Sequence, residues 1–212
     1  ELLEAIPGMI ATQHSGEGKA NQYFLRGFNL DHGTDFAGFT DNIPVNMRSH
    51  GHGQGYMDFN FVIPELVERI DYRKGPYYAD IGDFSAAGTA NMSTYTSLPA
   101  PYVDATIGQN GYLRGVAAGS FDAGGGTVLL GALAATNNGP WVLDNNLGQF
   151  SGLAKYTHGN GDSVWGVQIG GYTSTWNATD QVPQRAIDTG LIDRLGYIDP
   201  DLGGQTTRLW AG

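Results

Sequence analysis

The sequence contains no cysteine, and charged residues make up only 15% of its 212 residues. The absence of cysteine excludes a disulfide scaffold and every metal site that depends on thiolate ligands. It does not decide the compartment, because proteins without cysteine occur in both the cytosol and the cell envelope.

Basic residues are scarce: 11 Lys and Arg stand against 21 Asp and Glu, which gives a net charge of -10. Binding to nucleic acid needs clustered cations that neutralise phosphates, so we predict no nucleic-acid partner. No apolar run approaches 18 residues, and no charged segment leads into an apolar one, so we predict neither a spanning helix nor a signal peptide. The chain starts inside an apparently folded segment at Glu1 and stops at Gly212 where a strand begins, so we expect a fragment.

Glycine is abundant, with 33 residues, and aromatic residues account for 11% of the chain. Together with a hydrophobic content of 41%, this composition is typical of a glycine-rich β protein and not of a disordered chain. In the first half, Glu1–Ile10 predicts a short helix followed by a strand, and Asn21–Asn29 predicts a strand. Val67–Arg73 alternates as a strand that stops at Gly75-Pro76, and a second short strand is expected over Thr89–Thr96.

The ordered residues from Glu68 onward resemble the end of the plug domain of TonB-dependent outer-membrane receptors. The matching positions are Glu68, Arg69, Ile70, Asp71, Arg73, Lys74, Gly75, Pro76, Tyr78, Gly82, Gly88, Asn91 and Thr94. Leu25–Phe28 resembles a second plug signature, and Phe39–Val45 resembles a short plug hairpin in which Asn42 replaces the usual glycine. Asn also tolerates positive φ, so the turn is expected to survive.

From about Tyr102 the sequence shows alternating segments separated by Gly, Asn or Asp. They are Tyr102–Gly108, Tyr112–Phe121, Thr127–Thr136, Gln149–His158 and Val164–Trp176. In the last segment Trp165, Val167 and Ile169 share one face, while Gln168 and glycines share the other, which is the pattern of a transmembrane β-strand. Periodicity alone fits a soluble β-sandwich equally well. A barrel is preferred because it follows the plug in the family that the first half resembles.

Aromatic residues near strand ends are predicted to form interfacial girdles. They are Trp141, Tyr156, Tyr172 and Trp176.

The resulting fold prediction is an α+β plug domain, a small mixed sheet with short helices, followed by the first antiparallel strands of a transmembrane β-barrel. We place the N-terminally incomplete plug at residues 1–99 and the C-terminally truncated set of opening barrel strands at residues 100–212.

The least ordinary stretch is Arg48–Tyr56, where glycine at every second position predicts a loop. The resemblance implies that plug apices contact the solute, with candidate residues Arg26, His32, Arg48, His50, His52, Gln54 and Tyr56. A second interpretation is a metal site built from His50 and His52, with His32, Asp31 and Asp35 nearby in sequence. A third is a polar loop with hydrogen-bonded histidines. The site prediction contains no metal and no cofactor.

The charged residues Glu68, Arg69, Asp71 and Arg73 are predicted to form ion pairs that hold or gate the plug, next to the structural turn at Gly75 and Pro76. In a plug inside a polar lumen, breaking such a buried pair would leave a costly lone charge.

No enzyme is predicted, because the chain has no G-x-S-x-G elbow, no H-E-x-x-H helix and no phosphate-binding loop. The resemblance implies TonB-dependent active transport of a scarce, large solute, such as a ferric siderophore, cobalamin or an oligosaccharide. It also implies the outer membrane of a Gram-negative bacterium as the location. The implied partners are TonB with its inner-membrane energising complex, outer-membrane lipid and an unidentified solute.

The family's TonB box precedes the plug and is not found in this sequence. The alternative functions are a soluble carbohydrate-binding β module, with Trp141, Trp165 and Trp176 as stacking platforms, or a histidine-based metal-site protein.

Overall fold

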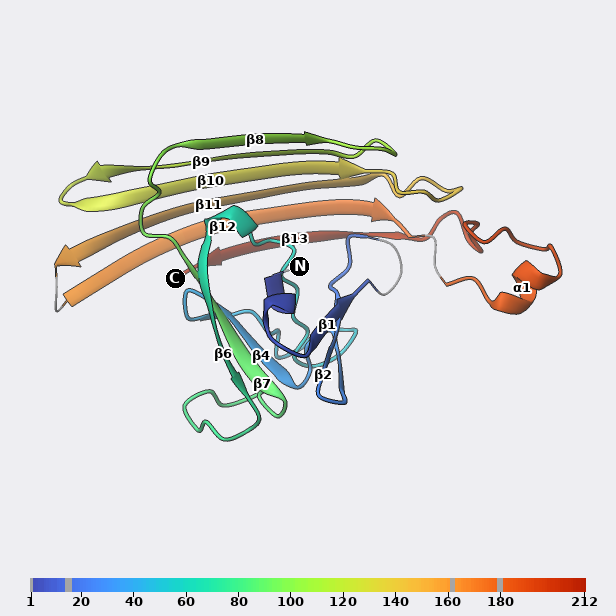
Figure 1. Ribbon diagram of the computed structural model, residues 1–212, viewed down its shortest axis with the longest axis horizontal. Coiled ribbons are helices and arrows are strands. Elements are labelled where there is room, and N and C mark those ends of the chain that lie inside the picture. Colours follow the sequence, from blue (N-terminus) through green and yellow to red (C-terminus); the bar gives the residue numbers. More distant parts are fainter. Residues whose placement is uncertain (1, 14–16, 161–162, 179–180) are drawn as a thin grey trace. The chain divides into compact units, whose positions relative to one another are not determined.

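The computed structural model describes residues 2–13, 17–160, 163–178 and 181–212 (Figure 1). The chain divides into two compact units, the first made of residues 1–14 and 20–95, the second of residues 15–19 and 96–212. Among the described residues, no helix has both the length and the apolar character needed to cross a membrane.

The first unit begins with a three-stranded antiparallel sheet in the order β1-β2-β3. The 3₁₀ turn η1 (Leu2–Ala5) precedes β1 (Met9–Thr12), which pairs with β2 (Gln22–Leu25), which in turn pairs with β3 (Phe28–Asp31). The single strand predicted over Asn21–Asn29 is therefore wrong. Arg26 and Gly27 take φ values of 52° and 85°, so they form the two-residue turn of a hairpin, a turn type that requires positive φ at both positions.

A four-stranded mixed sheet completes the first unit, in the order β5-β4-β7-β6. Strand β4 (Phe36–Thr40) runs parallel to β7 (Gly88–Thr94), while β5 (Ile43–Pro44) and β6 (Val67–Lys74) pair antiparallel with β4 and β7. Asn42 has a φ of 65° in the β4–β5 turn, as predicted for an asparagine in place of glycine. The mixed sheet confirms the sheet part of the predicted fold.

The helical part of the predicted plug is reduced to single 3₁₀ turns. In the described residues of the first unit the helical segments are η1 and η2 (Pro64–Leu66). The turn η1 lasts four residues because Pro7-Gly8 follows it and Gly8 takes a φ of 85°. The short helices expected in this unit are therefore present as 3₁₀ turns and not as α-helices. Its core consists of buried apolar side chains, among them Leu30, Phe36, Met57, Leu66 and Met92.

The second unit contains a six-stranded antiparallel sheet in the order β13-β12-β11-β10-β9-β8. The strands are β8 (Tyr102–Ile107), β9 (Leu113–Ala123), β10 (Gly126–Asn137), β11 (Leu147–Asn160), β12 (Ser163–Asn177) and β13 (Gly203–Ala211). Each of the five predicted segments coincides with one of these strands. The short helix α1 (Gln184–Asp188) lies between β12 and β13. In the described chain the sheet is open, with β8 and β13 as its edges.

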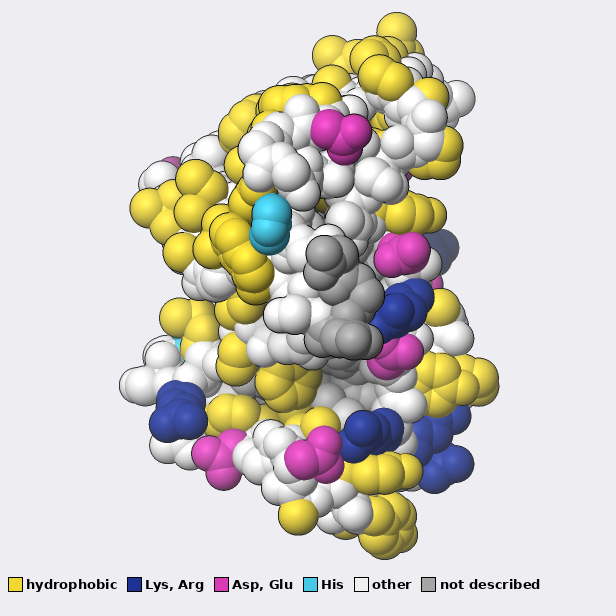
Figure 2. Space-filling view, turned by 90° about the vertical axis from the view of Figure 1, so that its left-hand side faces the viewer, with side chains coloured by type: hydrophobic (Ala, Val, Ile, Leu, Met, Phe, Trp, Pro, Cys, Tyr) yellow, Lys and Arg dark blue, Asp and Glu magenta, His cyan; other side chains and the backbone are white. Residues whose placement is uncertain are grey.

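The two faces of this sheet differ in chemistry. The pairing registers place a set of large apolar side chains on one face, here called the apolar face: Val103, Ile107, Leu113, Phe121, Leu130, Phe150, Val167, Ile169 and Leu209. All of them are exposed, up to 83% for Leu209. Figure 2 shows hydrophobic side chains gathered along the left margin of the view.

The other face carries all five Asp, Lys and Arg side chains of the six strands, and is here called the charged face. They are Asp104, Arg114, Asp122, Lys155 and Arg208. Buried Ser151, Gln168 and Ser174 share this face. The sheet therefore exposes large apolar side chains on one face, while the other face buries polar side chains together with apolar ones such as Leu129 and Leu133.

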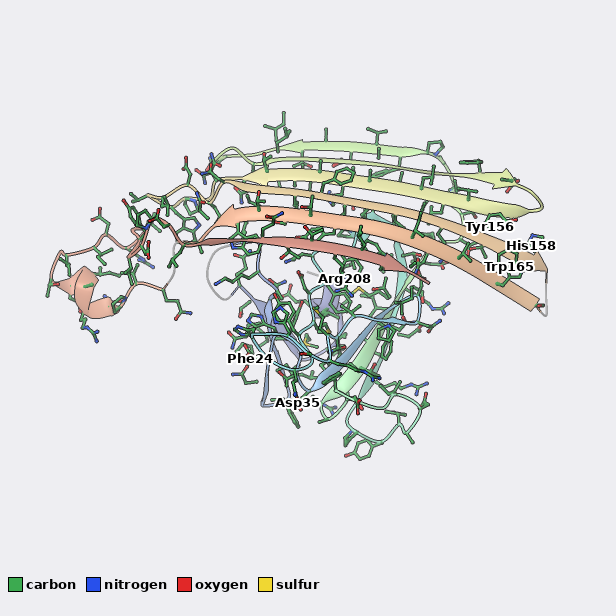
Figure 3. All side chains as sticks on the ribbon, turned by 180° about the vertical axis from the view of Figure 1, so that it is seen from behind. Phe24, Asp35, Tyr156, His158, Trp165 and Arg208 are labelled. Atoms are coloured by element: carbon green, nitrogen blue, oxygen red, sulfur yellow. The ribbon has the colours of Figure 1, made fainter. Side chains whose placement is uncertain are left out.

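The aromatic prediction is only partly correct. Tyr156, His158 and Trp165 cluster on the apolar face at one end of β11 and β12, with 5.5 Å between the ring centroids of Tyr156 and Trp165 (Figure 3). Tyr172 and Trp176 lie instead on the charged face and are buried, because they alternate with Ile169 and Thr173 along β12.

Trp176 packs against two glycines. An added Cβ at Gly18 or Gly204 would overlap its indole ring. Trp176 is therefore a packing residue of the second unit and has no open ring face for a sugar.

Candidate functional site

The glycine-rich segment predicted as a loop is a loop closed at its base. Met47 and Tyr56 form an isolated antiparallel bridge, in which Met47 N donates to Tyr56 O at 2.8 Å and Gly55 N donates to Met47 O at 2.8 Å. The loop then joins the end of β3, because Met57 N donates to the carbonyl oxygen of His32 at 2.6 Å. Residues 48–55 are thereby held beside Asp31 and His32.

Asn46 fixes the base of this loop. Its side-chain oxygen accepts from Gly38 N at 2.7 Å, and its Nδ2 lies 2.8 Å from the carbonyl oxygen of Gly55 and 2.9 Å from that of Phe36. A third carbonyl, that of Gly33, lies 3.2 Å from the same nitrogen. The sequence analysis missed Asn46, because a single asparagine between two short segments carries no spacing signal.

The loop brings His52 to Asp31 and His32. The distance from His52 Nε2 to Asp31 Oδ2 is 3.5 Å, and that from His32 Nε2 to Asp31 Oδ1 is 3.6 Å. All three candidate ligand atoms lie within 4.8 Å of one another. His32 is 4% exposed, whereas His52 and Asp31 are about half exposed at 46% and 45%. The cluster therefore has a buried base and an open side.

His50 does not join this cluster. Its ring stacks on Tyr56, with centroids 3.9 Å apart and an interplanar angle of 13°, and its Nδ1 accepts from His52 N at 3.1 Å. The two histidines of the H-G-H motif thus have different roles, since one faces Asp31 and the other covers a tyrosine. Asp35, the remaining acidic residue of the metal interpretation, is not part of the three-residue cluster.

Tyr56 is a half-buried residue at the centre of the histidine group. Its hydroxyl oxygen accepts from Ala20 N at 3.3 Å. Burial, with a smaller contribution from the negative charge of Asp58, raises the pKa of Tyr56, and the hydrogen bond from Ala20 opposes this shift. The phenol therefore stays neutral at any physiological pH.

The remaining predicted solute-contact residues are exposed and scattered. Arg48 and Gln54 lie in the loop, and Arg26 occupies the turn between β2 and β3. Of the seven predicted residues, the structure brings together His32, His50, His52 and Tyr56, with centroid distances of 3.9 to 6.2 Å between each histidine and Tyr56.

The charged residues of β6 form exposed pairs. Arg69 Nε donates to Asp71 Oδ2 at 2.8 Å, and Arg73 Nη1 donates to Asp80 Oδ2 at 3.0 Å. Glu68 is exposed beside them, and Asp80 was not among the predicted partners. Exposed pairs of this kind contribute little to stability. The adjoining turn is fixed by Gly75, which has a φ of 88° and whose N–H donates to Ala87 O at 2.8 Å, ahead of Pro76.

Comparison with known families gives one match: residues 1–89 match the family described as "TonB-dependent Receptor Plug Domain". Among solved structures, the chain is similar to the "Copper transporter OprC", with 15% identity and a TM-score of 0.66 over 84% of this chain and 28% of that one.

Two further solved structures are similar. A mutant of the ferric enterobactin receptor PfeA from Pseudomonas aeruginosa has 15% identity and a TM-score of 0.61 over 98% of this chain and 34% of that one. The FrpB iron transporter from Neisseria meningitidis has 18% identity and a TM-score of 0.58 over 82% of this chain and 29% of that one. The chain therefore spans about a third of the length of these proteins, and at such identities the likeness establishes the fold.

Proposed function

We propose that this chain carries the plug and the first barrel strands of an outer-membrane receptor, because residues 1–89 match the TonB-dependent receptor plug domain family. In this proposal residues 1–99 are the plug and residues 100–212 are the opening barrel strands. The intact protein would import a scarce solute across the outer membrane of a Gram-negative bacterium. The neighbours are transporters and receptors by their titles, which supports a role in transport rather than in catalysis.

The observation that carries the barrel part of the proposal is the chemistry of the six-stranded sheet. Its apolar face holds no Asp, Lys or Arg within the described strands, and all five such side chains point to the other face. A transmembrane barrel needs this arrangement, with lipid outside and a polar lumen inside. Strands β9 to β12, at 11 to 15 residues, are long enough for tilted spanning strands.

The cluster of Tyr156, His158 and Trp165 supports the same orientation. These rings lie on the apolar face at one end of the sheet, where an aromatic girdle meets the membrane interface. The alternative of a carbohydrate-binding module loses one of its three stacking platforms, since Trp176 is 8% exposed and cannot stack on a sugar, whereas Trp165 is 52% exposed.

The proposed range of solutes is narrower than the range that the sequence left open. The neighbours' names give copper, iron and ferric enterobactin as what those proteins handle, so solutes that carry iron or copper are favoured over cobalamin or oligosaccharides. Within the first unit, the exposed loop residues Arg48, His50, His52 and Gln54 are the proposed solute contacts. Arg26 is a further exposed candidate, while His32 and Tyr56 support the loop from below.

In this proposal, opening a passage past the plug requires mechanical work, and TonB with its inner-membrane energising complex supplies this work. Solute binding shifts the plug toward a state that TonB engages, and pulling then opens a passage. The exposed pairs Arg69–Asp71 and Arg73–Asp80 on β6 are the proposed gating contacts, since pairs of low intrinsic stability break under a modest load.

The test uses the full-length gene product in a Gram-negative host with and without TonB. The expected result is a protein that fractionates with outer membranes, migrates as a heat-modifiable band in a gel, and supports uptake of metal-bearing solutes only when TonB is present. A soluble product without a heat-dependent shift would overturn the receptor assignment. Uptake that persists without TonB would overturn the energised mechanism.

A further inference from the structure

Asp31, His32 and His52 have the chemistry of a metal site: two imidazoles and one carboxylate suit a divalent transition metal such as zinc. They come from two separate segments, the end of β3 and the closed loop, and meet only because Met47, Tyr56 and Asn46 close the loop base. We propose that these three residues bind one divalent transition-metal ion, with zinc as the reference ion. The proposal does not rest on transport, because it concerns binding by the protein alone.

Hydrogen bonding orients the buried ligand. His32 Nδ1 lies 3.2 Å from the carbonyl oxygen of Asn21. A carbonyl oxygen can only accept, so this contact places the proton on Nδ1 and leaves the lone pair of a neutral ring on Nε2. That nitrogen faces Asp31. Metal-binding histidines characteristically donate their second ring N–H to such an outer partner, which fixes the tautomer and the ring orientation.

The spacing of the ligand atoms fits a small ion. Zinc–nitrogen and zinc–oxygen bonds of about 2.0 to 2.2 Å in tetrahedral geometry separate neighbouring ligand atoms by about 3.3 to 3.5 Å. His52 Nε2 lies 3.5 Å from Asp31 Oδ2 and His32 Nε2 lies 3.6 Å from Oδ1, so each imidazole faces a different oxygen of the same carboxylate. These separations are too long for good hydrogen bonds. One ligand atom from each residue lies within 4.8 Å of the other two, so a single ion would need side-chain shifts of about 1 Å.

The backbone also presents Asp31 in an unusual way. Its φ is 48°, and its N–H is held by the side chain of Asn29 at 3.0 Å. Positive φ is uncommon for residues other than glycine, and such conformations cluster at ligand clamps. Here it turns the carboxylate toward both histidines. With three protein ligands, a tetrahedral ion keeps a fourth position, and the half-exposed Asp31 and His52 leave a route to it.

The test is a zinc titration of the purified full-length protein in detergent, by competition with a chromophoric chelator, followed by metal analysis after desalting. We expect about one zinc ion per chain, given one cluster of three ligands. Asp31→Asn keeps the shape and tolerates positive φ, and His52→Ala removes an exposed ligand, so neither endangers the fold. Each should weaken zinc binding by at least about tenfold.

A histidine outside the cluster serves as the control. His158→Ala removes a histidine of the second unit that stacks near Tyr156. This variant should bind zinc as the unchanged protein does. Co²⁺ in place of Zn²⁺ gives a visible spectrum that reports coordination directly, and this spectrum should be lost in Asp31→Asn and His52→Ala.

The proposal is overturned if zinc is sub-stoichiometric, if Asp31→Asn and His52→Ala bind as tightly as the unchanged protein, or if His158→Ala weakens binding as much as they do. No TonB, membrane gradient or solute is present in this experiment. A protein that binds zinc but fails the TonB-dependent uptake test would therefore contradict only the proposed transport, and a transporter without zinc binding would contradict only the metal site.

Discussion

At the scale of single residues, Asn46 has the largest structural influence on the loop. It satisfies the N–H of Gly38 and the carbonyl oxygens of Phe36 and Gly55, and it therefore ties the loop base to β4. Neither alanine nor aspartate can replace an asparagine in this role. Alanine leaves the buried partners unsatisfied, and aspartate points a second oxygen at carbonyl oxygens.

We predict that Asn46→Ala lowers the free energy of unfolding of the first unit by roughly 3 kcal/mol, the cost of leaving two to three partly buried groups without partners. Amide hydrogen exchange should speed up at Met47 and Gly55, whose N–H groups close the loop. Asn46→Asp should destabilise at least as much. An Asn46→Asp protein with unchanged exchange would show that the amide nitrogen does not hold the loop.

Tyr56 gives the loop a dependence on alkaline pH. Burial raises its pKa above the ordinary value of about 10, so the folded protein holds the phenol neutral where the unfolded chain ionises it. This contribution to stability is complete below about pH 10 and is lost as the pH rises through the folded-state pKa.

We therefore predict that an ultraviolet pH titration of the unchanged protein shows one tyrosine that ionises at a higher pH than an ordinary tyrosine. This component should be missing from the titration of Tyr56→Phe. The unchanged protein should lose more stability than Tyr56→Phe between about pH 9 and about pH 11, in denaturant titrations at both values. Parallel losses in the two proteins would show that Tyr56 ionises equally in the folded and unfolded chains.

At the scale of elements, the turns show what the sequence could and could not predict. Asn42 was predicted to take positive φ because the plug hairpin places glycine there, and it does. Arg26-Gly27 was assigned to a strand because the residues around it alternate in side-chain type without interruption. A two-residue hairpin turn does not interrupt this alternation, so the pattern cannot reveal the turn. Periodicity locates strands well but does not report where a chain reverses.

The candidate site was predictable only in its composition. The H-G-H motif drew attention to His50 and His52, whereas Asp31 and His32 were linked to them only by nearness in sequence. Which histidine meets Asp31 depends on the Met47–Tyr56 bridge and on the contacts of Asn46, which are tertiary features without a local signal. His50 and His52 face different neighbours because residues 48–55 form a loop and not a strand.

Two glycines of the first unit allow a matched comparison at the element scale. Gly27 has a φ of 85° with nothing within 4 Å of an added Cβ, so Gly27→Ala costs only the backbone strain of about 1 to 2 kcal/mol. At Gly88, φ is 148° and an added Cβ would overlap the carbonyl oxygen of Arg73 on the paired strand β6.

We predict that Gly88→Ala destabilises the protein more than Gly27→Ala, because β6 and β7 must separate to make room. Thermal unfolding of both variants measures the difference, and the exchange of β6 amides should increase only in Gly88→Ala. Equal effects would show that backbone strain alone, and not the close approach of the two strands, sets the cost.

At the scale of the whole molecule, the unequal distribution of charge over the two faces of the six-stranded sheet allows a test of whether the apolar face meets lipid or water. Ala105 and Thr106 are neighbours on β8, both exposed, with Ala105 on the apolar face and Thr106 on the charged face next to Asp104. An arginine at either position therefore adds the same charge, and the two variants differ mainly in the face that receives it.

If lipid covers the apolar face, Ala105→Arg places a cation against hydrocarbon, at a cost that reaches about 2 to 4 kcal/mol at the bilayer midplane and falls toward the interfaces. We predict that Ala105→Arg reduces the heat-modifiable fraction in outer membranes more than Thr106→Arg, which lies on the charged face beside the carboxylate of Asp104 and opposite Arg114. The measurement is a fractionation of the full-length protein followed by gels of heated and unheated samples. In a soluble domain both arginines would be solvated and equally tolerated, so equal yields of the two variants would refute the assignment of the apolar face to lipid.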